Sequence, residues 1–260
     1  METRSLTIQN TEINDASKCF VIAEIGHNHQ GNVETAKKMI KAAVDAGASA
    51  VKLQKRDNRS LFTSAYYDRP YNSENSFGGS YGEHREFLEF DYDQYKELQS
   101  YSNELGTIFF ATAFDFKSAD FLQNLDMPAF KIASGDLKNL PLINYLADFG
   151  KPLIISTGGG YQEDIDRVVE SLESKKAQYS ILQCTAGYPP AWNELNLGVI
   201  TTLRNKFPST VIGFSSHDNG IAMSVAAYAL GARIIEKHFT LNRTLKGTDH
   251  AFSLEPQGLS

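Results

Sequence analysis

Cysteine is scarce in this sequence, since the 260 residues contain only Cys19 and Cys184. Two thiols are too few for the disulfide framework of a small secreted domain, so we expect a reducing compartment, the cytoplasm. Long apolar runs are also missing. No run approaches the ~20 residues of a membrane-spanning helix, and the polar N-terminus lacks the apolar core of a signal peptide. The sequence therefore predicts a cytoplasmic protein with no membrane partner.

Positive charge is not in excess either. The chain has 25 Lys and Arg residues against 31 Asp and Glu residues, which gives a formal net charge of −6. This balance argues against nucleic acid as a partner and gives no general attraction for anions. An anionic substrate would therefore need a local cluster of positive groups.

Short apolar runs separated by helical patterns are what the sequence has in abundance. Strands separated by helices pair in parallel with right-handed crossovers. Eight such units in about 250 residues predict an α/β fold, a (β/α)₈ TIM barrel. The alternative is a doubly wound open sheet, but "EIGHNHQG" after the first run is not a dinucleotide-binding turn. The eight predicted strands are residues 20–25, 50–54, 106–112, 129–133, 152–156, 179–184, 211–215 and 233–238.

Three segments fall outside this repeat. We assign residues 1–19 to an N-terminal extension and residues 20–260 to the barrel. Residues 55–90 form an insertion whose length indicates a functional loop, which lids the barrel mouth or binds a polyhydroxylated ligand. A solvated loop is the alternative. No convincing helical pattern follows the last strand, so we expect the barrel to lack its last outer helix and the chain to be part of a larger protein.

Polar residues collect where the predicted strands end, which is the catalytic face of such barrels. His217 and His238 occupy equivalent places in successive units. Neighbouring strands lie roughly 5 Å apart, so the two imidazoles are close enough to share one divalent cation. Without a thiolate pattern, a moderately hard ion such as Mn²⁺ fits better than structural zinc. The alternative is that one histidine caps a helix and the other is a core residue.

Lys52 and Lys131 lie inside apolar strands, where an unpaired ammonium group is costly. Two interpretations are open: buried ion pairs with Glu24 or Glu236, or a cradle for an anionic ligand. The turn at residues 156–160, Ser-Thr-Gly-Gly-Gly, favours the cradle, because glycines let backbone N–H groups approach a phosphate.

Several motifs, in one order, resemble the sialic acid synthase family, which includes N-acetylneuraminate synthase and its legionaminic and pseudaminic acid relatives. They span about Phe20 to Pro256 and read "FVIAEIGHNHQGNVETAKKMI", "AVKLQK", "FKIASGDLKNLPLI", "PLIISTGG", "LQCTAGYPP", "IGFSSHDNG" and "IIEKHFTLNRTLKGTDHAFSLEP". The resemblance implies condensation of phosphoenolpyruvate with an N-acetylated aldose such as N-acetylmannosamine, with release of phosphate. It also implies a homodimer and a divalent cation at His217 and His238, with Mn²⁺ expected and Mg²⁺ or Co²⁺ as alternatives.

The same resemblance implies roles for individual residues. His217 and His238 would be catalytic through the cation, and Glu24 would position or deprotonate the water that captures the oxocarbenium ion. Phosphoenolpyruvate would contact Lys52, Thr112, Lys131, Ser134, Ser156 and Ser215, and the sugar would contact Gln54, Asn75, Asp136, Tyr188 and Asp249.

The sequence departs from the family pattern in several places. Ala186 stands where many relatives have Asn, Asp136 where they often have Glu, and Gly159 where Met is common. The family's C-terminal antifreeze-like domain, which supplies an Arg to the partner subunit's sugar site, has no counterpart in these residues. Two other functions therefore stay open: a Schiff-base aldolase that uses Lys131 or Lys237, and a barrel that only binds a sugar or a partner protein.

Overall fold

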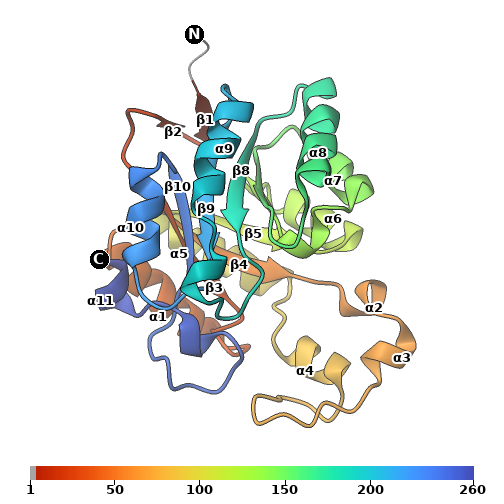
Figure 1. Ribbon diagram of the computed structural model, residues 1–260. Helices are drawn as coiled ribbons and strands as arrows, with labels where there is room; N and C mark the ends of the chain where they lie inside the picture. Colours follow the sequence, from red (N-terminus) through yellow and green to blue (C-terminus); the bar gives the residue numbers. More distant parts are fainter. Residues whose placement is uncertain (1–3) are drawn as a thin grey trace.

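The computed structural model describes residues 4–260 and has eight parallel strands closed into a barrel (Figure 1). Parallel pairing of the last strand with the first closes the barrel, so the TIM barrel prediction is confirmed and the open-sheet alternative is wrong. Each strand begins and ends within two residues of its predicted bounds. The barrel strands are β3 (Phe20–Gly26), β4 (Ala50–Lys55), β5 (Ile108–Ala113), β6 (Phe130–Ile132), β7 (Leu153–Ser156), β8 (Tyr179–Cys184), β9 (Val211–Ser216) and β10 (Ile234–His238).

Helices cover the outside of the barrel, and most of them pack through an apolar stripe, whereas α10 buries only Ala227. In α1 (Val33–Asp45) the buried residues are Ala36, Met39, Ile40 and Ala43, which recur at the spacing of one helix face. Short polar side chains begin several helices by accepting a hydrogen bond from a backbone N–H of the first turn. The other outer helices are α5 (Tyr92–Glu104), α6 (Phe116–Asn124), α7 (Leu140–Ala147), α8 (Gln162–Ser174), α9 (Gly198–Lys206) and α10 (Ala222–Ala229).

The strand register brings polar residues of neighbouring strands to the same level. His238 pairs with Glu24 across β10 and β3, and Glu24 pairs with Lys52 across β3 and β4. Thr112 pairs with Lys131 across β5 and β6. The barrel therefore gathers side chains that are up to about 200 residues apart in the chain.

A β-hairpin of β1 (Ser5–Ile8) and β2 (Thr11–Asn14) precedes the barrel. These strands were not predicted within the N-terminal extension of residues 1–19, of which residues 1–3 lie outside the described residues. After β2, Asp15 accepts hydrogen bonds from Arg204, at the end of α9, and from Arg233, just before β10. These contacts hold the hairpin at the N-terminal ends of the strands, opposite the expected catalytic face.

The insertion contains α2 (Asn58–Leu61), α3 (Ser64–Tyr67) and α4 (Tyr81–Phe87), which extend from the lower end of the barrel in Figure 1. Aromatic rings pack inside it, including Phe77 stacked on Phe87 with ring centroids 4.9 Å apart. Gly82 lies against the Tyr67 ring so closely that a Cβ would stand 2.3 Å from it. The insertion thus contains short helices and packed aromatic rings, and whether it acts as a lid, a ligand-binding loop or a solvated loop stays open.

Beyond β10, the described chain contains the 3₁₀ turn η3 (His250–Phe252) and the short helix α11 (Pro256–Leu259). Two further 3₁₀ turns, η1 (Ser134–Asp136) and η2 (Trp192–Glu194), follow β6 and β8. Among residues 4–260, no helix combines the length and the apolar character needed to cross a membrane. The cytoplasmic location stays a prediction.

Candidate active site

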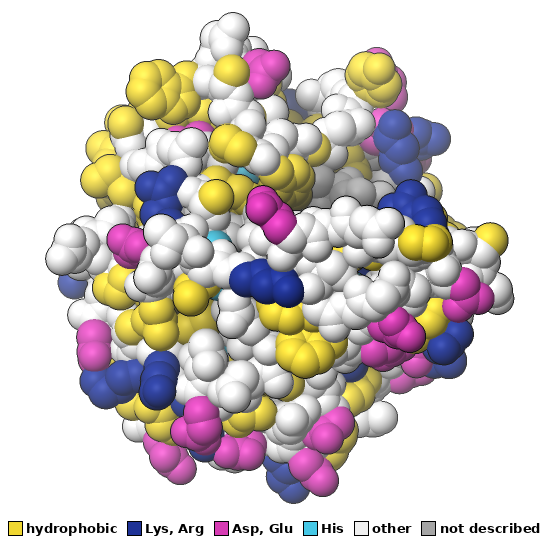
Figure 2. Space-filling view, turned by 90° about the horizontal axis from the view of Figure 1, so that it is seen from below, with side chains coloured by type: hydrophobic (Ala, Val, Ile, Leu, Met, Phe, Trp, Pro, Cys, Tyr) yellow, Lys and Arg dark blue, Asp and Glu magenta, His cyan; other side chains and the backbone are white. Residues whose placement is uncertain are grey.

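A cavity of about 480 Å³ opens at the C-terminal ends of the strands. Each of the eight strands places at least one polar or ionisable side chain in its wall, and Gln54 in β4 and His238 in β10 are second ones. In Figure 2, which looks onto this end, histidine appears only as small patches near the centre, because other side chains cover it. In order from β3 to β10, the wall residues are Glu24, Lys52, Thr112, Lys131, Ser156, Cys184, Ser215 and Glu236.

Twelve of the fourteen predicted site residues line this cavity; Asn75 and Asp136 do not. Asn75 lies in the insertion, where its Oδ1 accepts a hydrogen bond of 2.9 Å from the backbone N–H of Gly247. Asp136 lies in η1 and accepts a 3.3 Å hydrogen bond from Asn139. Burial raises the pKa of Asp136. Both residues therefore hold loops next to the cavity.

The two buried lysines are each paired with a carboxylate. Lys52 forms an ion pair with Glu24 and donates a 2.7 Å hydrogen bond to Thr112. Lys131 donates to Ser156 over 2.6 Å, and its Nζ lies 3.7 Å from Glu236 Oε1. The ion-pair interpretation is confirmed for both lysines. Because both pairs face the cavity, this pairing does not exclude a role in binding an anion.

Charge in this part of the wall is balanced. Burial alone would raise the pKa of Glu236, but Lys131 and Lys52 lower it to about 2. Glu236 is therefore a carboxylate at neutral pH, and Ser215 donates a 2.9 Å hydrogen bond to it. Two ammonium groups and the carboxylates of Glu24 and Glu236 cancel, so these four groups alone do not make the cavity attractive to anions.

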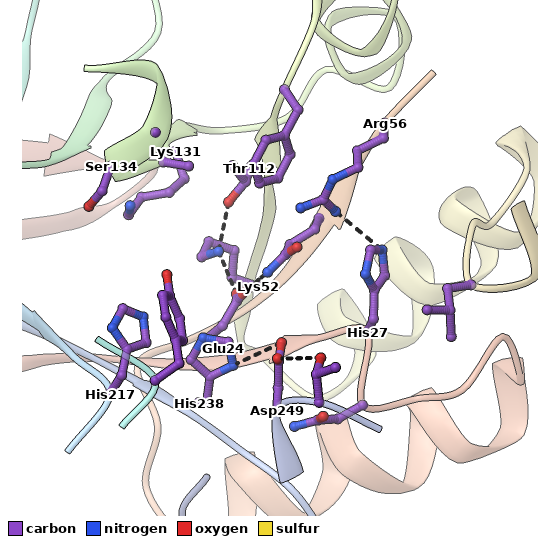
Figure 3. A pocket seen from close by; sticks show the side chains of 18 of the residues that line it. Glu24, His27, Lys52, Arg56, Thr112, Lys131, Ser134, His217, His238 and Asp249 are labelled. Atoms are coloured by element: carbon purple, nitrogen blue, oxygen red, sulfur yellow. Dashed lines mark hydrogen bonds and ion pairs between the residues drawn. The ribbon is translucent and has the colours of Figure 1, made fainter. Parts of the chain in front are cut away.

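The His217 and His238 rings lie side by side at the cavity wall, with centroids 5.3 Å apart (Figure 3). His217 Nδ1 lies 3.3 Å from the carbonyl oxygen of Thr185. An Nδ1–H that donates to this carbonyl leaves the Nε2 lone pair free. Burial lowers the pKa of His217 to about 3, so the ring is neutral at pH 7 and able to ligate a metal. His238 Nδ1 is buried without a hydrogen-bond partner, 3.7 Å from Asp249 Oδ2.

These features fit a cation that takes two protein ligands. Within residues 4–260, no group of three or more His, Cys, Asp or Glu residues is arranged to hold a metal ion. A cation between His217 and His238 would therefore complete its coordination shell with water and substrate, as catalytic ions do and structural zinc does not.

A second polar cluster lies on the other side of the cavity and was missed by the sequence analysis. It consists of His27, Arg56 and Arg85. Arg56 follows β4 directly, so the rule that strand ends carry the chemistry could have found it. Arg85 lies in α4, and only the packing of the insertion brings it to the cavity.

Comparisons with known proteins match one family and several relatives. The NeuB family matches residues 39–260. The N-acetylneuraminate-9-phosphate synthase of Mus musculus is 45% identical over 242 residues, which are 93% of this chain and 67% of the mouse protein. The N,N'-diacetyllegionaminic acid synthase of Campylobacter jejuni is 38% identical over 246 residues, 93% of this chain and 73% of that protein. The chain thus spans about two thirds of the length of such relatives.

A solved structure resembles the whole chain. The N-acetylneuraminic acid synthetase of Leptospira borgpetersenii, in complex with citrate, has a TM-score of 0.88 and 33% sequence identity. The match covers 99% of this chain and 85% of that one.

Proposed function

The chain belongs to the NeuB family, and on this premise we propose that it condenses phosphoenolpyruvate with an N-acetylated aldose resembling N-acetylmannosamine. The products are a sialic-acid-type nonulosonate and inorganic phosphate. The observation that carries the proposal is the cavity wall, in which two buried lysines stand beside a pair of adjacent imidazoles. Homodimer formation stays a prediction.

Phosphoenolpyruvate is proposed to bind at the lysine side of the cavity. Lys52 and Lys131 can each donate to a carboxylate or phosphate oxygen. The hydroxyl groups of the same wall add uncharged donors, and Gly158 N–H, which donates to Ser134 Oγ over 2.9 Å, brings backbone near the same place. The hydroxyl donors are Thr112, Ser134, Ser156 and Ser215.

Because the lysines are already paired with carboxylates, an anionic substrate requires further positive charge. A divalent cation at His217 and His238 would provide it. We propose Mn²⁺, with Mg²⁺ or Co²⁺ as alternatives, since imidazole and oxygen ligands suit these ions. When bound, such an ion acts as a Lewis acid that polarises the aldehyde oxygen of the open-chain sugar.

The reaction then balances as follows. The enol carbon of phosphoenolpyruvate forms a bond to the aldehyde carbon of the sugar, whose oxygen takes up a proton. Water adds to the resulting oxocarbenium carbon and gives up a proton, and the tetrahedral adduct loses phosphate to leave a keto acid. Glu24 is the proposed base for this water, because Lys52 and Gln54, the latter at 2.6 Å, hold its carboxylate in the cavity wall.

The sugar is proposed to lie between the imidazoles and the outer loops. Tyr188 covers His217, with ring centroids 4.1 Å apart, and Asp249 lies next to His238. Asn75 acts as a positioning residue, since it holds Gly247 two residues from Asp249. Asp136 supports the loop after β6 in the same way.

The aldolase alternative now depends on Lys131. Lys237 does not belong to the described residues that line the cavity, and its ammonium donates to Asp218 Oδ1 over 2.9 Å. Burial lowers the pKa of Lys131, as a Schiff-base lysine requires. Borohydride reduction in the presence of pyruvate would label Lys131 in an aldolase and leave a synthase unlabelled.

The direct test measures phosphate release from phosphoenolpyruvate with a panel of N-acetylated hexoses and their phosphates, with and without Mn²⁺. We expect release that requires both a sugar and the metal. A matched pair of variants, Lys131→Met in the cavity and Lys151→Met on the surface, should separate loss of the site from a general effect. Sugar binding without any phosphate release would instead support a non-catalytic barrel.

A further inference from the structure

Two guanidinium groups approach the same imidazole at the edge of the cavity. Arg85 Nη1 lies 3.2 Å from His27 Nδ1, and Arg56 Nη1 lies 3.5 Å from His27 Nε2. All three side chains line the cavity. Arg56 comes from the barrel, just after β4, whereas Arg85 comes from α4 of the insertion. The cluster therefore joins the barrel to the insertion.

The hydrogen bonds of this cluster cannot all be made. Burial and the charges of Arg56 and Arg85 lower the pKa of His27 well below its usual value, so the ring is neutral. A neutral imidazole has one N–H and one lone pair, and a guanidinium group only donates. His27 can therefore accept from one arginine but not from both. The contact of Arg85 with Nδ1 is the shorter of the two, and Glu89 Oε1 lies 3.5 Å from Nε2. Both observations favour a proton on Nε2. This tautomer leaves Arg56 without an acceptor on the ring.

Arg56 also has no carboxylate partner. Its side chain is 8% exposed, yet no acidic residue in the described part of the chain forms an ion pair with it or with Arg85. The nearby Glu89 is already engaged, since it accepts from Lys55 over 2.9 Å and from the Arg56 backbone N–H over 3.2 Å. The ring of Phe114 covers one face of the guanidinium, 3.6 Å from its central carbon. A buried charge without a partner is costly unless a ligand compensates it.

This cluster is separate from the lysines proposed to bind phosphoenolpyruvate. In Figure 3, Arg56 and His27 lie on the side of the cavity opposite Lys131, Ser134 and His217. A sugar whose aldehyde meets the imidazole pair can therefore point its other end toward the arginines. Two guanidinium groups carry the charge and the forked donors that match a phosphate dianion.

We propose that Arg56 and Arg85 form an anion subsite for the terminal phosphate monoester of the acceptor, so that this enzyme prefers an N-acetylated sugar phosphate to the neutral sugar. The inference rests on the proposed function and deepens it, because family membership alone leaves phosphorylation of the acceptor open. His27 is a positioning residue that accepts a hydrogen bond from the Arg85 guanidinium group.

The test compares N-acetylmannosamine 6-phosphate with N-acetylmannosamine, at saturating phosphoenolpyruvate and Mn²⁺. The quantity measured is the ratio of kcat/KM for the phosphorylated sugar to kcat/KM for the neutral one. We expect a ratio well above 1 for the unmodified chain and a fall of about 100-fold in Arg56→Gln and in Arg85→Gln, the loss typical of a desolvated charge pair. Arg59→Gln, an exposed arginine of the same insertion, is the matched control and should keep the ratio.

Other outcomes overturn the subsite. An unmodified chain that uses both sugars equally well has no such preference. Equal losses for both sugars would assign Arg56 a structural role, and a raised KM for phosphoenolpyruvate alone would assign the arginines to that substrate. An acceptor carrying a carboxylate that outcompetes the phosphate would also refute the proposal.

A binding experiment separates failure of the subsite from failure of the proposed function. Calorimetric titration with N-acetylmannosamine 6-phosphate, without phosphoenolpyruvate, requires no turnover. If Arg56→Gln weakens this binding while the unmodified chain releases no phosphate, the subsite stands and the condensation is wrong. If binding is the same in Arg56→Gln and in the unmodified chain, the subsite is wrong whatever the activity.

Discussion

Replacing Lys131 by Met should destabilise the protein by about 3 kcal/mol at pH 7. The pKa of Glu236 is lowered from 4.5 to about 2, with Lys131 as the largest favourable cause. Such a shift corresponds to about 3 kcal/mol of net stabilisation of the carboxylate, to which Lys131, Lys52 and the Ser215 hydrogen bond all contribute against the cost of burial. The variant also leaves Glu236, 6% exposed, without its nearest cation, and breaking one side of a buried pair costs about 3–5 kcal/mol. The estimate from the pKa shift and the estimate from the broken ion pair are therefore of similar size.

The measurement is urea unfolding followed by far-ultraviolet circular dichroism, in the presence of a chelator so that metal binding does not contribute. The loss should be greatest at pH 7. Because the folded pKa of Glu236 is depressed, its contribution is present above pH 4.5 and disappears as the pH falls toward 2. The stability curves of the unmodified chain and of Lys131→Met should therefore converge at acid pH.

A double variant separates the structural role of this pair from its proposed role in binding. Lys131→Met/Glu236→Gln removes both charges and should recover at least about 2 kcal/mol of the loss, since no uncompensated charge is left. Phosphate release should not recover. Lys151→Met, which breaks an exposed pair with Asp126, should cost about 0.5 kcal/mol or less. A Lys131→Met variant as stable as this control, or a double variant no more stable than the single one, would refute the reasoning.

Three further predictions concern the metal pair, a loop contact and acid stability. His217→Ala should lower kcat for phosphate release at least about 100-fold. It should also weaken Mn²⁺ binding, measured by electron paramagnetic resonance, and leave the circular dichroism spectrum unchanged. Full Mn²⁺ binding in this variant would contradict the metal assignment. Gly31→Ala should destabilise the protein far more than Gly106→Ala, as measured by urea unfolding. Both glycines have a φ near +70° (+68° and +71°), but only at Gly31 would the new Cβ stand 2.2 Å from the Phe87 carbonyl oxygen. Equal losses of stability would exclude this clash as the cause. Burial lowers the pKa of His84 to about 4 from 6.5, so its contribution to stability is lost as the pH falls from 6.5 to 4. His84→Gln should remove about 2 kcal/mol of that pH dependence, and an unchanged slope would refute the shift.

The barrel was predictable because its strands contain short apolar runs, such as "FVIA" at the start of β3, and are followed by helical patterns. The hairpin was missed although a signal is present. Leu6, Ile8 and Ile13 alternate with polar residues around a tight turn, where Gln9 has a φ of 52°. Strands of four residues are too short for this alternation to stand out. The helices of the insertion were missed for a similar reason, because four to seven residues are too few for a helical pattern to stand out.

The roles of the predicted site residues stay predictions, but their placement at the cavity is easiest to derive where strand geometry decides position. A residue such as Lys131 or Ser215 is fixed by its register in the barrel, so its place follows once the strand is recognised. Asn75 and Asp136 came from the family resemblance, lie in loops and do not line the cavity. Arg85 reaches the cavity only through the aromatic packing of the insertion, which no spacing rule encodes.

This contrast divides the chemistry of the cavity between two parts of the chain. The strand residues form two neutralised pairs, Lys52 with Glu24 and Lys131 with Glu236, and their geometry is set by the closed barrel. The uncompensated positive charge lies instead at Arg56 and Arg85, where the barrel meets the insertion. Charges that are balanced within the protein can hold a reacting group in place without trapping the product. Charges that lack a partner select which ligand enters, because only an anion of matching size relieves them. On the proposed function, the barrel would therefore carry the condensation step and the insertion the choice of acceptor.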